Sequence, residues 1–150
     1  MTDEIRPARP QDAPRLKEIA LAAYGVYVER IGLEPAPMTA DYDEAIASAE
    51  VSVATVDGEI AGYVVVRPGD RELLENVAVA QGHQGQGIGR ALIDHVEKRA
   101  KERGATYVEL YTHELMTENR QLYARLGYQE FGFIVEDGFR RVLMEKRLAG

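Results

Sequence analysis

The sequence predicts an α/β protein in which about four helices flank one mixed sheet of about seven strands. Residues 73–79 form an apolar run that leads through a Gly-rich loop into an amphipathic helix, and then to a second apolar run at 107–111. This order is typical of a crossover between parallel strands. Asp57-Gly58 lies between two other apolar runs, which is a strong signal for an antiparallel hairpin. Parallel and antiparallel neighbours together predict a mixed sheet.

The composition predicts a single domain over residues 1–150. Of the 150 residues, 45% are hydrophobic and 29% are charged, which are ordinary values for a globular protein long enough to bury a core. No apolar run approaches the ~20 residues of a membrane span, and the acidic N-terminus is unlike a signal peptide. We therefore expect a cytoplasmic protein without a membrane partner, acting as a monomer or a homodimer.

Cysteine content and charge exclude several classes of function. The chain has no cysteine, which removes disulfides, thiolate metal sites and a cysteine nucleophile. The net charge of −7 argues against a nucleic-acid partner, because such a partner needs a basic face. The same charge would attract a cationic substrate, although solubility alone explains it equally well. His95 and His113 lack metal-like spacing, so no metal is expected.

In the first half of the chain, helices precede the hairpin strands. Residues 5–8 predict a short edge strand, since Pro7 is tolerated only at an edge. Asp12 is a suitable N-cap for a helix over residues 13–30, in which Gly25 is a point where the helix can break in two. The elements that follow are a turn rich in proline and glycine at 32–38, a helix at 39–49, and strands at 51–56 and 59–66.

The second half alternates strands and helices around the Gly-rich loop. Residues 68–70 (Pro-Gly-Asp) turn the chain into the central strand at 72–79, and Gly104 is a fitting end for the long helix. Glu136-Asp137-Gly138 is the turn between the last two strands. The remaining predicted elements are strands at 107–111, 128–134 and 140–147 and a short helix at 116–126.

The Gly-rich loop at residues 82–89 is the candidate ligand site. Four of its eight residues are glycines, so a ligand can approach the backbone closely. The helix start that follows offers N–H groups and a dipole that favour an anion. The dinucleotide fingerprint fails because Arg90 stands where its last glycine belongs, and the P-loop fails because Ile88-Gly89 replaces Lys-Ser/Thr. A purely structural turn is the alternative.

Residues 84–89, QGQGIG, preceded by Val77-Ala78-Val79, resemble the Q/R-x-x-G-x-G/A signature of the GCN5-related N-acetyltransferases. The order of elements is similar to the acyl-CoA N-acyltransferase fold of that family along nearly the whole chain. The resemblance implies that acetyl-CoA is the acyl donor and that its pyrophosphate binds the loop. The residues that it assigns to acetyl-CoA are Val77, Ala78, Val79, Gln84, Gly85, Gln86, Gly87, Ile88, Gly89, Arg90 and Asn119.

The same resemblance implies a gap in the sheet. In the family, a bulge in the first crossover strand separates it from the second strand, and the freed backbone groups bind pantetheine much as an added strand would. We expect this bulge near Val77-Ala78, where the Val77 N–H would polarise the thioester carbonyl. The alternative is an ordinary strand that is paired along its whole length.

Residues 121–128, QLYARLGY, resemble the L-Y-x-x-x-G-F/Y segment of the family, in which the tyrosine hydroxyl points at the coenzyme sulfur. This resemblance assigns Tyr123 as the acid for the leaving thiolate, and the alternative is a core tyrosine with a surface hydroxyl. The family often has asparagine seven residues before this tyrosine, where this chain has Met116. Asn119, one helical turn later, either takes over the coenzyme contact or faces solvent.

Two glutamates are candidates for the general base. An alkylammonium has a pKa near ~10, so an amine acceptor must lose a proton before it attacks. Glu75 and Glu109 lie in the middle of neighbouring predicted strands, and either could accept this proton directly or through a water. We prefer Glu75 because it shares a strand with the predicted coenzyme contact. A salt-bridged or solvated carboxylate is the alternative for each.

The first helices and their connection cover the acceptor in this family. The resemblance implies transfer of acetyl to a primary amine of a small molecule or to an exposed protein or peptide amine. With no cysteine to form an acyl-enzyme, we expect this transfer to be direct. A non-catalytic acyl-CoA sensor on the same fold is the alternative. Arg30 would either pair with an acceptor carboxylate or lie exposed at a helix end. The candidate acceptor residues are Tyr24, Tyr27, Arg30, Met38 and Tyr42.

Overall fold

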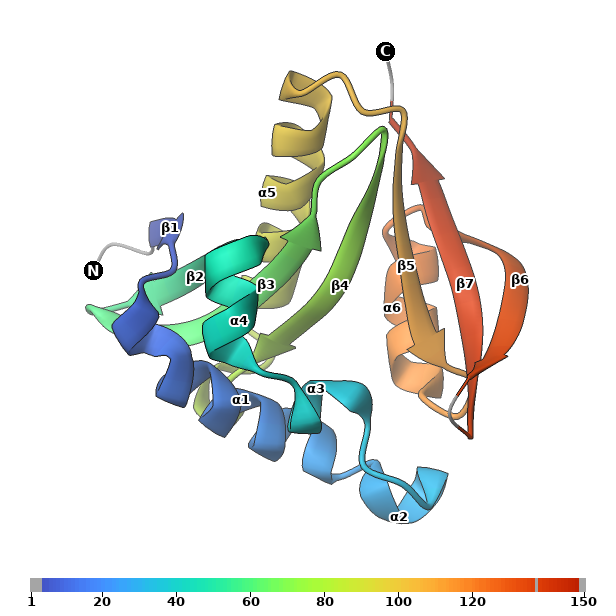
Figure 1. Cartoon of the computed structure of the whole chain (residues 1–150), viewed down its shortest axis with the longest axis horizontal. Coiled ribbons are helices and arrows are strands. Elements are labelled where there is room, and N and C mark those ends of the chain that lie inside the picture. Colours follow the sequence, from blue (N-terminus) through green and yellow to red (C-terminus); the bar gives the residue numbers. More distant parts are fainter. Residues whose placement is uncertain (1–3, 137, 149–150) are drawn as a thin grey trace.

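One mixed sheet of seven strands runs through residues 4–136 and 138–148, the part of the chain that the computed structural model describes (Figure 1). The strand order is β1-β2-β3-β4-β5-β7-β6, and β4–β5 is its parallel pair. The predicted α/β fold with a mixed sheet is therefore confirmed; the predicted turn residue Asp137 lies outside the described residues. The strands are β1 (Glu4–Pro7), β2 (Glu50–Val56), β3 (Glu59–Arg67), β4 (Arg71–Val79), β5 (Tyr107–His113), β6 (Gln129–Glu136) and β7 (Phe139–Arg147).

Helices cover both faces of the sheet (Figure 1). One buried cluster joins α1 and α4 to one face, and a second cluster joins α5 and the Tyr123 side of α6 to the other. None of the helices within the described ranges has the length and apolar character needed to cross a membrane. The helices are α1 (Ala13–Gly25), α2 (Val28–Ile31), α3 (Ala36–Thr39), α4 (Tyr42–Ser48), α5 (Ile88–Glu102) and α6 (Thr117–Arg125).

The described residues contain six α-helices rather than the four that the sequence predicts. The first predicted helix does break at Gly25, the residue with the poorest helix propensity in that segment apart from proline, and α2 is its short continuation. The predicted turn at 32–38 overlaps the single-turn helix α3, which has Pro37 near its start, where proline is well tolerated. The helix predicted at 39–49 begins only at α4, because the Asp41 side chain accepts the Glu44 N–H and caps it there.

Helix α5 packs against β3 at a glycine. A Cβ on Gly62 would lie 3.0 Å from the Ala78 carbonyl oxygen, 3.1 Å from Ile88 Cγ2 and 3.2 Å from Leu92 Cδ1. The first of these neighbours is a backbone atom, which cannot rotate away as a side chain can. The missing side chain of Gly62 therefore sets the distance between the sheet and the helix that follows the Gly-rich loop.

We expect Gly62→Ala to lower the free energy of unfolding by about 1–3 kcal/mol, because the added methyl overpacks the contact between sheet and helix. Urea denaturation measures this change. Gly25→Ala is the matched control, since a Cβ there meets nothing within 4 Å, and it should leave stability unchanged or slightly higher. Equal stability of the two variants would contradict the proposed close contact.

Strands β4 and β5 pair only over the first part of their length. Their register runs from Arg71–Tyr107 to Leu74–Leu110, although β4 continues to Val79 and β5 to His113. The two strands diverge beyond this point, as Figure 1 shows. The predicted separation of the crossover strands is therefore present in the fold.

The bulge in β4 lies at Glu75 and not near Val77-Ala78, so its predicted position was wrong. Val65 of β3 pairs with Asn76 and Val66 pairs with Leu74, which leaves Glu75 without a residue opposite it. The reason is that the side chains on either side of Glu75 lie on opposite faces of the sheet. The Leu74 side chain packs in the α5 cluster, whereas the Asn76 side chain bonds to tyrosines on the α1 side. Residues two apart in a regular strand share a face, so one extra residue is needed between them.

Candidate active site

A pocket of about 220 Å³ opens where β4 and β5 separate. Tyr24 of α1 and Tyr123 of α6 both line it, although these helices cover opposite faces of the sheet. The pocket therefore passes through the sheet, and a ligand in it can be contacted from both layers of helices. Its lining also includes Asp41, Tyr42, Glu44, Arg67, Glu75, Asn76, Val77, Tyr111, His113, Met116, Asn119, Phe139 and Arg141.

The backbone of Val77 points into this gap. The Ala80 N–H donates to the Ala61 carbonyl at 2.7 Å, which makes Ala61–Ala80 a hydrogen-bonded pair of the β3–β4 ladder. Such pairs alternate along an antiparallel ladder, so Val64–Val77 is a non-hydrogen-bonded pair and the Val77 N–H and C=O face away from β3. The Tyr24 hydroxyl donates to the Val77 carbonyl at 2.7 Å, and the Val77 N–H is directed into the gap.

A buried network of tyrosines holds Asn76, the residue after the bulge. The Asn76 Nδ2 donates to the Tyr42 hydroxyl at 2.8 Å, the Tyr63 hydroxyl donates to Asn76 Oδ1 at 3.2 Å, and the two hydroxyls lie 2.8 Å apart. Burial raises the pKa of Tyr24, Tyr42 and Tyr63, so all three stay protonated and can donate. Sequence reasoning missed Tyr63. The signal that pointed to such a network was Asn76 itself, because an amide inside an apolar strand needs partners.

The Gly-rich loop ends at the start of α5 in a shape suited to an anion. Gly85 and Gly87 both have φ of +82°, a left-handed conformation that only glycine adopts readily, and Gly87 is the N-cap of α5. The first intrahelical bond runs from the Ala91 N–H to the Gly87 carbonyl at 3.0 Å, so the preceding N–H groups point out of the helix end. These groups, with the helix dipole, can bind phosphate oxygens. The predicted loop residues Gln84, Gln86 and Arg90 are exposed around this helix start, and Ile88 is buried beneath it. A Cβ on Gly89 would lie 3.5 Å from Val79 Cγ2.

Helix α6 carries Tyr123 and Asn119 on the side that lines the pocket. The Tyr123 side chain is 6% exposed, and its ring packs edge-on against Tyr128 with centroids 6.0 Å apart. Burial raises the pKa of Tyr123, so its hydroxyl remains protonated and can donate a proton or hydrogen bond. Met116, which also lines the pocket, is buried one turn before Asn119. The structure thus brings the predicted acid and the predicted coenzyme amide together.

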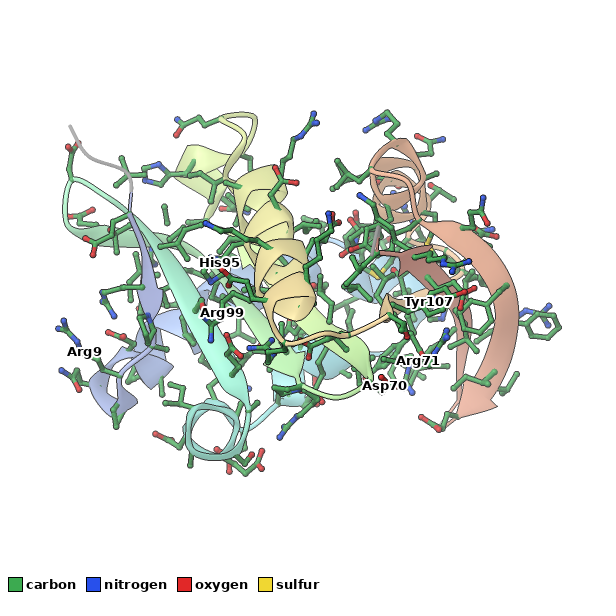
Figure 2. All side chains as sticks on the ribbon, turned by 90° about the horizontal axis from the view of Figure 1, so that it is seen from above. Arg9, Asp70, Arg71, His95, Arg99 and Tyr107 are labelled. Atoms are coloured by element: carbon green, nitrogen blue, oxygen red, sulfur yellow. The ribbon has the colours of Figure 1, made fainter. Side chains whose placement is uncertain are left out.

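The two predicted bases lie in different places. Glu75 lines the pocket, and its Oε2 lies 3.1 Å from Arg67 Nε. Glu109 is not part of the lining found among the described residues; it pairs with Arg71, which also contacts Glu145. Arg71 stacks on the Tyr107 ring at the paired end of β4 and β5 (Figure 2), with its Cζ 4.2 Å from the ring centroid. The structure therefore brings Glu75, but not Glu109, to the site.

Only some of the predicted acceptor residues line the pocket. Tyr24 and Tyr42 line the pocket, while Met38 is buried against α1. Arg30 instead joins α2 to α6: its Nη1 lies 2.8 Å from Glu118 Oε1 and donates to the Leu115 carbonyl at 3.1 Å. Tyr27 lies beneath the Arg30 guanidinium, with 5.1 Å between Cζ and the ring centroid. Residues of β5 and β7 that line the pocket, Tyr111, His113, Phe139 and Arg141, received no role from the sequence.

A gapped mixed sheet with a helix start beside the gap and a protonated tyrosine within it is suited to an extended, phosphate-bearing ligand between two strands. The model of the acetyltransferase (GNAT) family matches residues 14–128, and the chain belongs to this family. This result confirms the resemblance seen in the sequence. Within the described residues, no group of three or more His, Cys, Asp or Glu side chains is placed to hold a metal.

Similar proteins include enzymes named as acetyltransferases. Streptothricin acetyltransferase of Streptomyces lavendulae is 36% identical over 75 residues, which are 48% of this chain and 40% of that protein. The chain spans about half the length of the curated relatives it matches, from 40% to 56%.

Two solved structures show the same fold. A GCN5-related N-acetyltransferase from Rhodopseudomonas palustris has a TM-score of 0.81 at 24% identity, with 99% of this chain and 97% of that chain covered. A GNAT family acetyltransferase from Elizabethkingia anophelis, with acetyl-CoA bound, has a TM-score of 0.72 at 24% identity over 97% of this chain and 98% of that chain. These similarities establish the fold.

Proposed function

We propose that this chain is an acetyl-CoA-dependent N-acetyltransferase that transfers acetyl directly to a primary amine of a small molecule or to an exposed protein or peptide amine. The observation that carries the proposal is the pocket through the sheet, which holds Glu75, Tyr123 and the Val77 backbone in one space. Membership of the acetyltransferase family supports it, as does the relative with acetyl-CoA bound on the same fold. The absence of cysteine from the sequence supports direct transfer rather than an acyl-enzyme.

The chain has suitable groups for each part of acetyl-CoA. The glycines of the loop and the free N–H groups at the start of α5 would bind the pyrophosphate. The backbone groups of Val77 and Val79 face the gap and would hydrogen-bond the pantetheine arm as a neighbouring strand would, whereas those of the predicted contact Ala78 face β3. Asn119 would contact the coenzyme from α6.

Three groups would carry the chemistry. The Val77 N–H donates to the thioester carbonyl and stabilises the charge that develops on its oxygen. Glu75 accepts the proton of the acceptor ammonium, directly or through a water, so that the nitrogen can form its bond to the acetyl carbon. As the carbon–sulfur bond breaks, the Tyr123 hydroxyl gives its proton to the sulfur, so that coenzyme A leaves as the thiol, and the second proton that the nitrogen loses on becoming an amide restores the hydroxyl. Because the residues fix the two substrates side by side, positioning supplies a large share of the rate.

We expect Gly87→Val to weaken acetyl-CoA binding by about tenfold or more, the loss of about one hydrogen bond to a charged group. A side chain at this left-handed position strains the N-cap and covers the N–H groups that face the phosphates. Calorimetry measures the Kd. Gly104→Val is the matched control, because Gly104 has φ of +81° just beyond the other end of α5 and equally open surroundings. It should lose stability but keep the Kd; equal Kd values in the two variants would contradict the loop assignment.

A thiol-release assay with acetyl-CoA and a mixed panel of amines, amino acids and peptides tests the proposed function. Release of free coenzyme A that depends on an amine, with the acetylated amine found by mass spectrometry, is the expected result. Tight binding of acetyl-CoA without thiol release from any member of the panel would instead favour a non-catalytic acyl-CoA sensor. Failure to bind acetyl-CoA would contradict both functions.

A further inference from the structure

The β5–β7 wall of the pocket contains an arginine between aromatic rings. Arg141 of β7 lines the pocket, and its Cζ lies 5.1 Å from the ring centroids of both Tyr111 and Phe139. His113 extends this wall, packing edge-on against Phe139 with centroids 6.0 Å apart. The Arg141 side chain is only 12% exposed, so its charge acts in surroundings with little water to screen it.

The Arg141 guanidinium has more N–H donors than its ion pair with Glu136 uses. Its Nη1 donates to Glu136 Oε1 at 2.5 Å, which is the ion pair that Arg141 forms within the described residues. The Glu136 side chain is 58% exposed, and ion pairs with exposed partners are weak. A guanidinium carries five N–H donors in a planar fork that matches a carboxylate. Within the described residues, the remaining donors of Arg141 have no hydrogen-bond partner, so they can bind a ligand in the pocket.

Arg67, the other arginine of the lining, forms a bond through each of its three nitrogens. Its Nε bonds to Glu75 at 3.1 Å, its Nη1 to Ser48 at 2.8 Å and its Nη2 to Glu44 at 3.5 Å. The β4–α4 wall of the pocket therefore presents Glu75, Glu44 and Asp41 against this one cation. This side carries an excess of negative charge, which suits an ammonium group.

The pocket is thus polarised, with carboxylates on the β4–α4 wall and a guanidinium on the β5–β7 wall. Tyr111 lies within the field of both walls. Burial raises the pKa of Tyr111, Glu75 raises it further, and Arg141 opposes the shift. A purely cationic acceptor such as a polyamine would place positive charge against Arg141, at a cost that the low exposure of this side chain makes large.

We infer that the acceptor is a small amine that also carries a carboxylate, and that Arg141 binds this carboxylate while the amino group faces Glu75. This inference rests on the proposed function and names the class of acceptor for the same site. A free amino acid has the required chemistry. Both α-amino acids and ω-amino acids carry an amine and a carboxylate. They differ in the length of the chain between these two groups.

The test compares each amino acid with its own amide, which keeps the amine but removes the negative charge. Thiol release would be followed for α-amino acids and for ω-amino acids of rising chain length, each paired with its amide, in the wild type, Arg141→Gln and Arg140→Gln. Arg140 is the matched control because it lies next to Arg141 on β7 but pairs with Glu114 at 2.8 Å and stacks over Phe133 at 4.0 Å. Comparing variants within each pair cancels the difference in amine basicity.

The wild type should turn over at least one amino acid with a kcat/KM about tenfold or more above that of its amide, as expected for one charged hydrogen-bonding contact. Arg141→Gln should raise the KM for the acid about tenfold, remove the preference and leave the amide unchanged. Arg140→Gln should keep the preference of the wild type.

Several outcomes would overturn the inference and leave the proposed function standing. These are equal use of acid and amide by the wild type, turnover of diamines or polyamines alone, and an Arg141→Gln variant that loses both members of each pair to the same extent. The last of these results would show that Arg141 only supports the fold. Absence of thiol release from every amine would overturn the inference and the proposed function together.

Discussion

Replacing Tyr123 with phenylalanine is expected to lower kcat by about 100-fold, the usual contribution of a positioned proton donor. Tyr123 lines the pocket, and in the proposed mechanism its hydroxyl acts on the sulfur only as the carbon–sulfur bond breaks, so the Kd for acetyl-CoA should not change. Steady-state thiol release gives kcat, and calorimetry gives the Kd. A variant as fast as the wild type under saturating substrates would refute the role of Tyr123.

The pKa of Tyr123 adds a test at alkaline pH. Burial raises this pKa above the ordinary value of 10.0, and the hydroxyl is active in its protonated form. The donor is therefore retained as the pH rises through neutrality, and it is lost only above the ordinary tyrosine range. We therefore expect kcat to change with pH in the same way in the wild type and in Tyr123→Phe between pH 8 and about 10.

Tyr128→Phe is the matched control for Tyr123→Phe. Tyr128 is also buried and touches the Tyr123 ring, but its hydroxyl donates to Glu97 Oε2 at 2.9 Å and does not line the pocket. Its loss should lower stability by about 1 kcal/mol, the net worth of one hydrogen bond, while kcat stays close to that of the wild type. An equal loss of kcat in both variants would mean that packing of α6, not proton donation, governs turnover.

Replacing Glu75 with glutamine is expected to lower kcat at neutral pH by about 100-fold, because the acceptor ammonium then loses the carboxylate that takes its proton in the proposed mechanism. Glutamine keeps the shape of the side chain and can still accept from Arg67. As the pH approaches the amine pKa of ~10, more acceptor is already deprotonated, so the gap between variant and wild type should narrow. The pH profile of kcat measures this convergence; a constant gap would argue against a base.

Glu109→Gln supplies the control for Glu75→Gln. Glu109 lies on the strand next to β4 and also pairs with an arginine, Arg71, but it is outside the pocket lining. We expect its kcat to match that of the wild type at every pH. A loss in Glu109→Gln with none in Glu75→Gln would reverse the preference between the two carboxylates.

The features that the sequence predicts well are local. The loop at residues 84–89 and the helix after it are encoded in one continuous stretch, because the glycines needed for left-handed turns and the apolar face of α5 lie together in the chain. The break at Gly25 and the hairpin at Asp57-Gly58 are local for the same reason. The crossover topology follows from the length and order of these elements.

The features that the sequence does not predict depend on contacts between distant segments. The bulge at Glu75 is set by which neighbours face α5 and which face the tyrosines, and this is known only once both layers are in place. Arg141 enters the site through the pairing of β5 with β7, which puts it opposite His113. Arg30 lies at a helix end as the sequence suggested, but only the fold reveals Glu118 beside it.

The divergence of β4 and β5 gives the sheet four open edges instead of two. Besides the outer strands β1 and β6, the last residues of β4 and β5 expose backbone groups that any extended chain could pair with. Outer edges are usually protected by charge, proline or short length. Here the Tyr24 hydroxyl occupies the Val77 carbonyl, so a helix side chain blocks one inner edge against strand addition. The same residue that lines the pocket thus also occupies a backbone acceptor that an added strand would need.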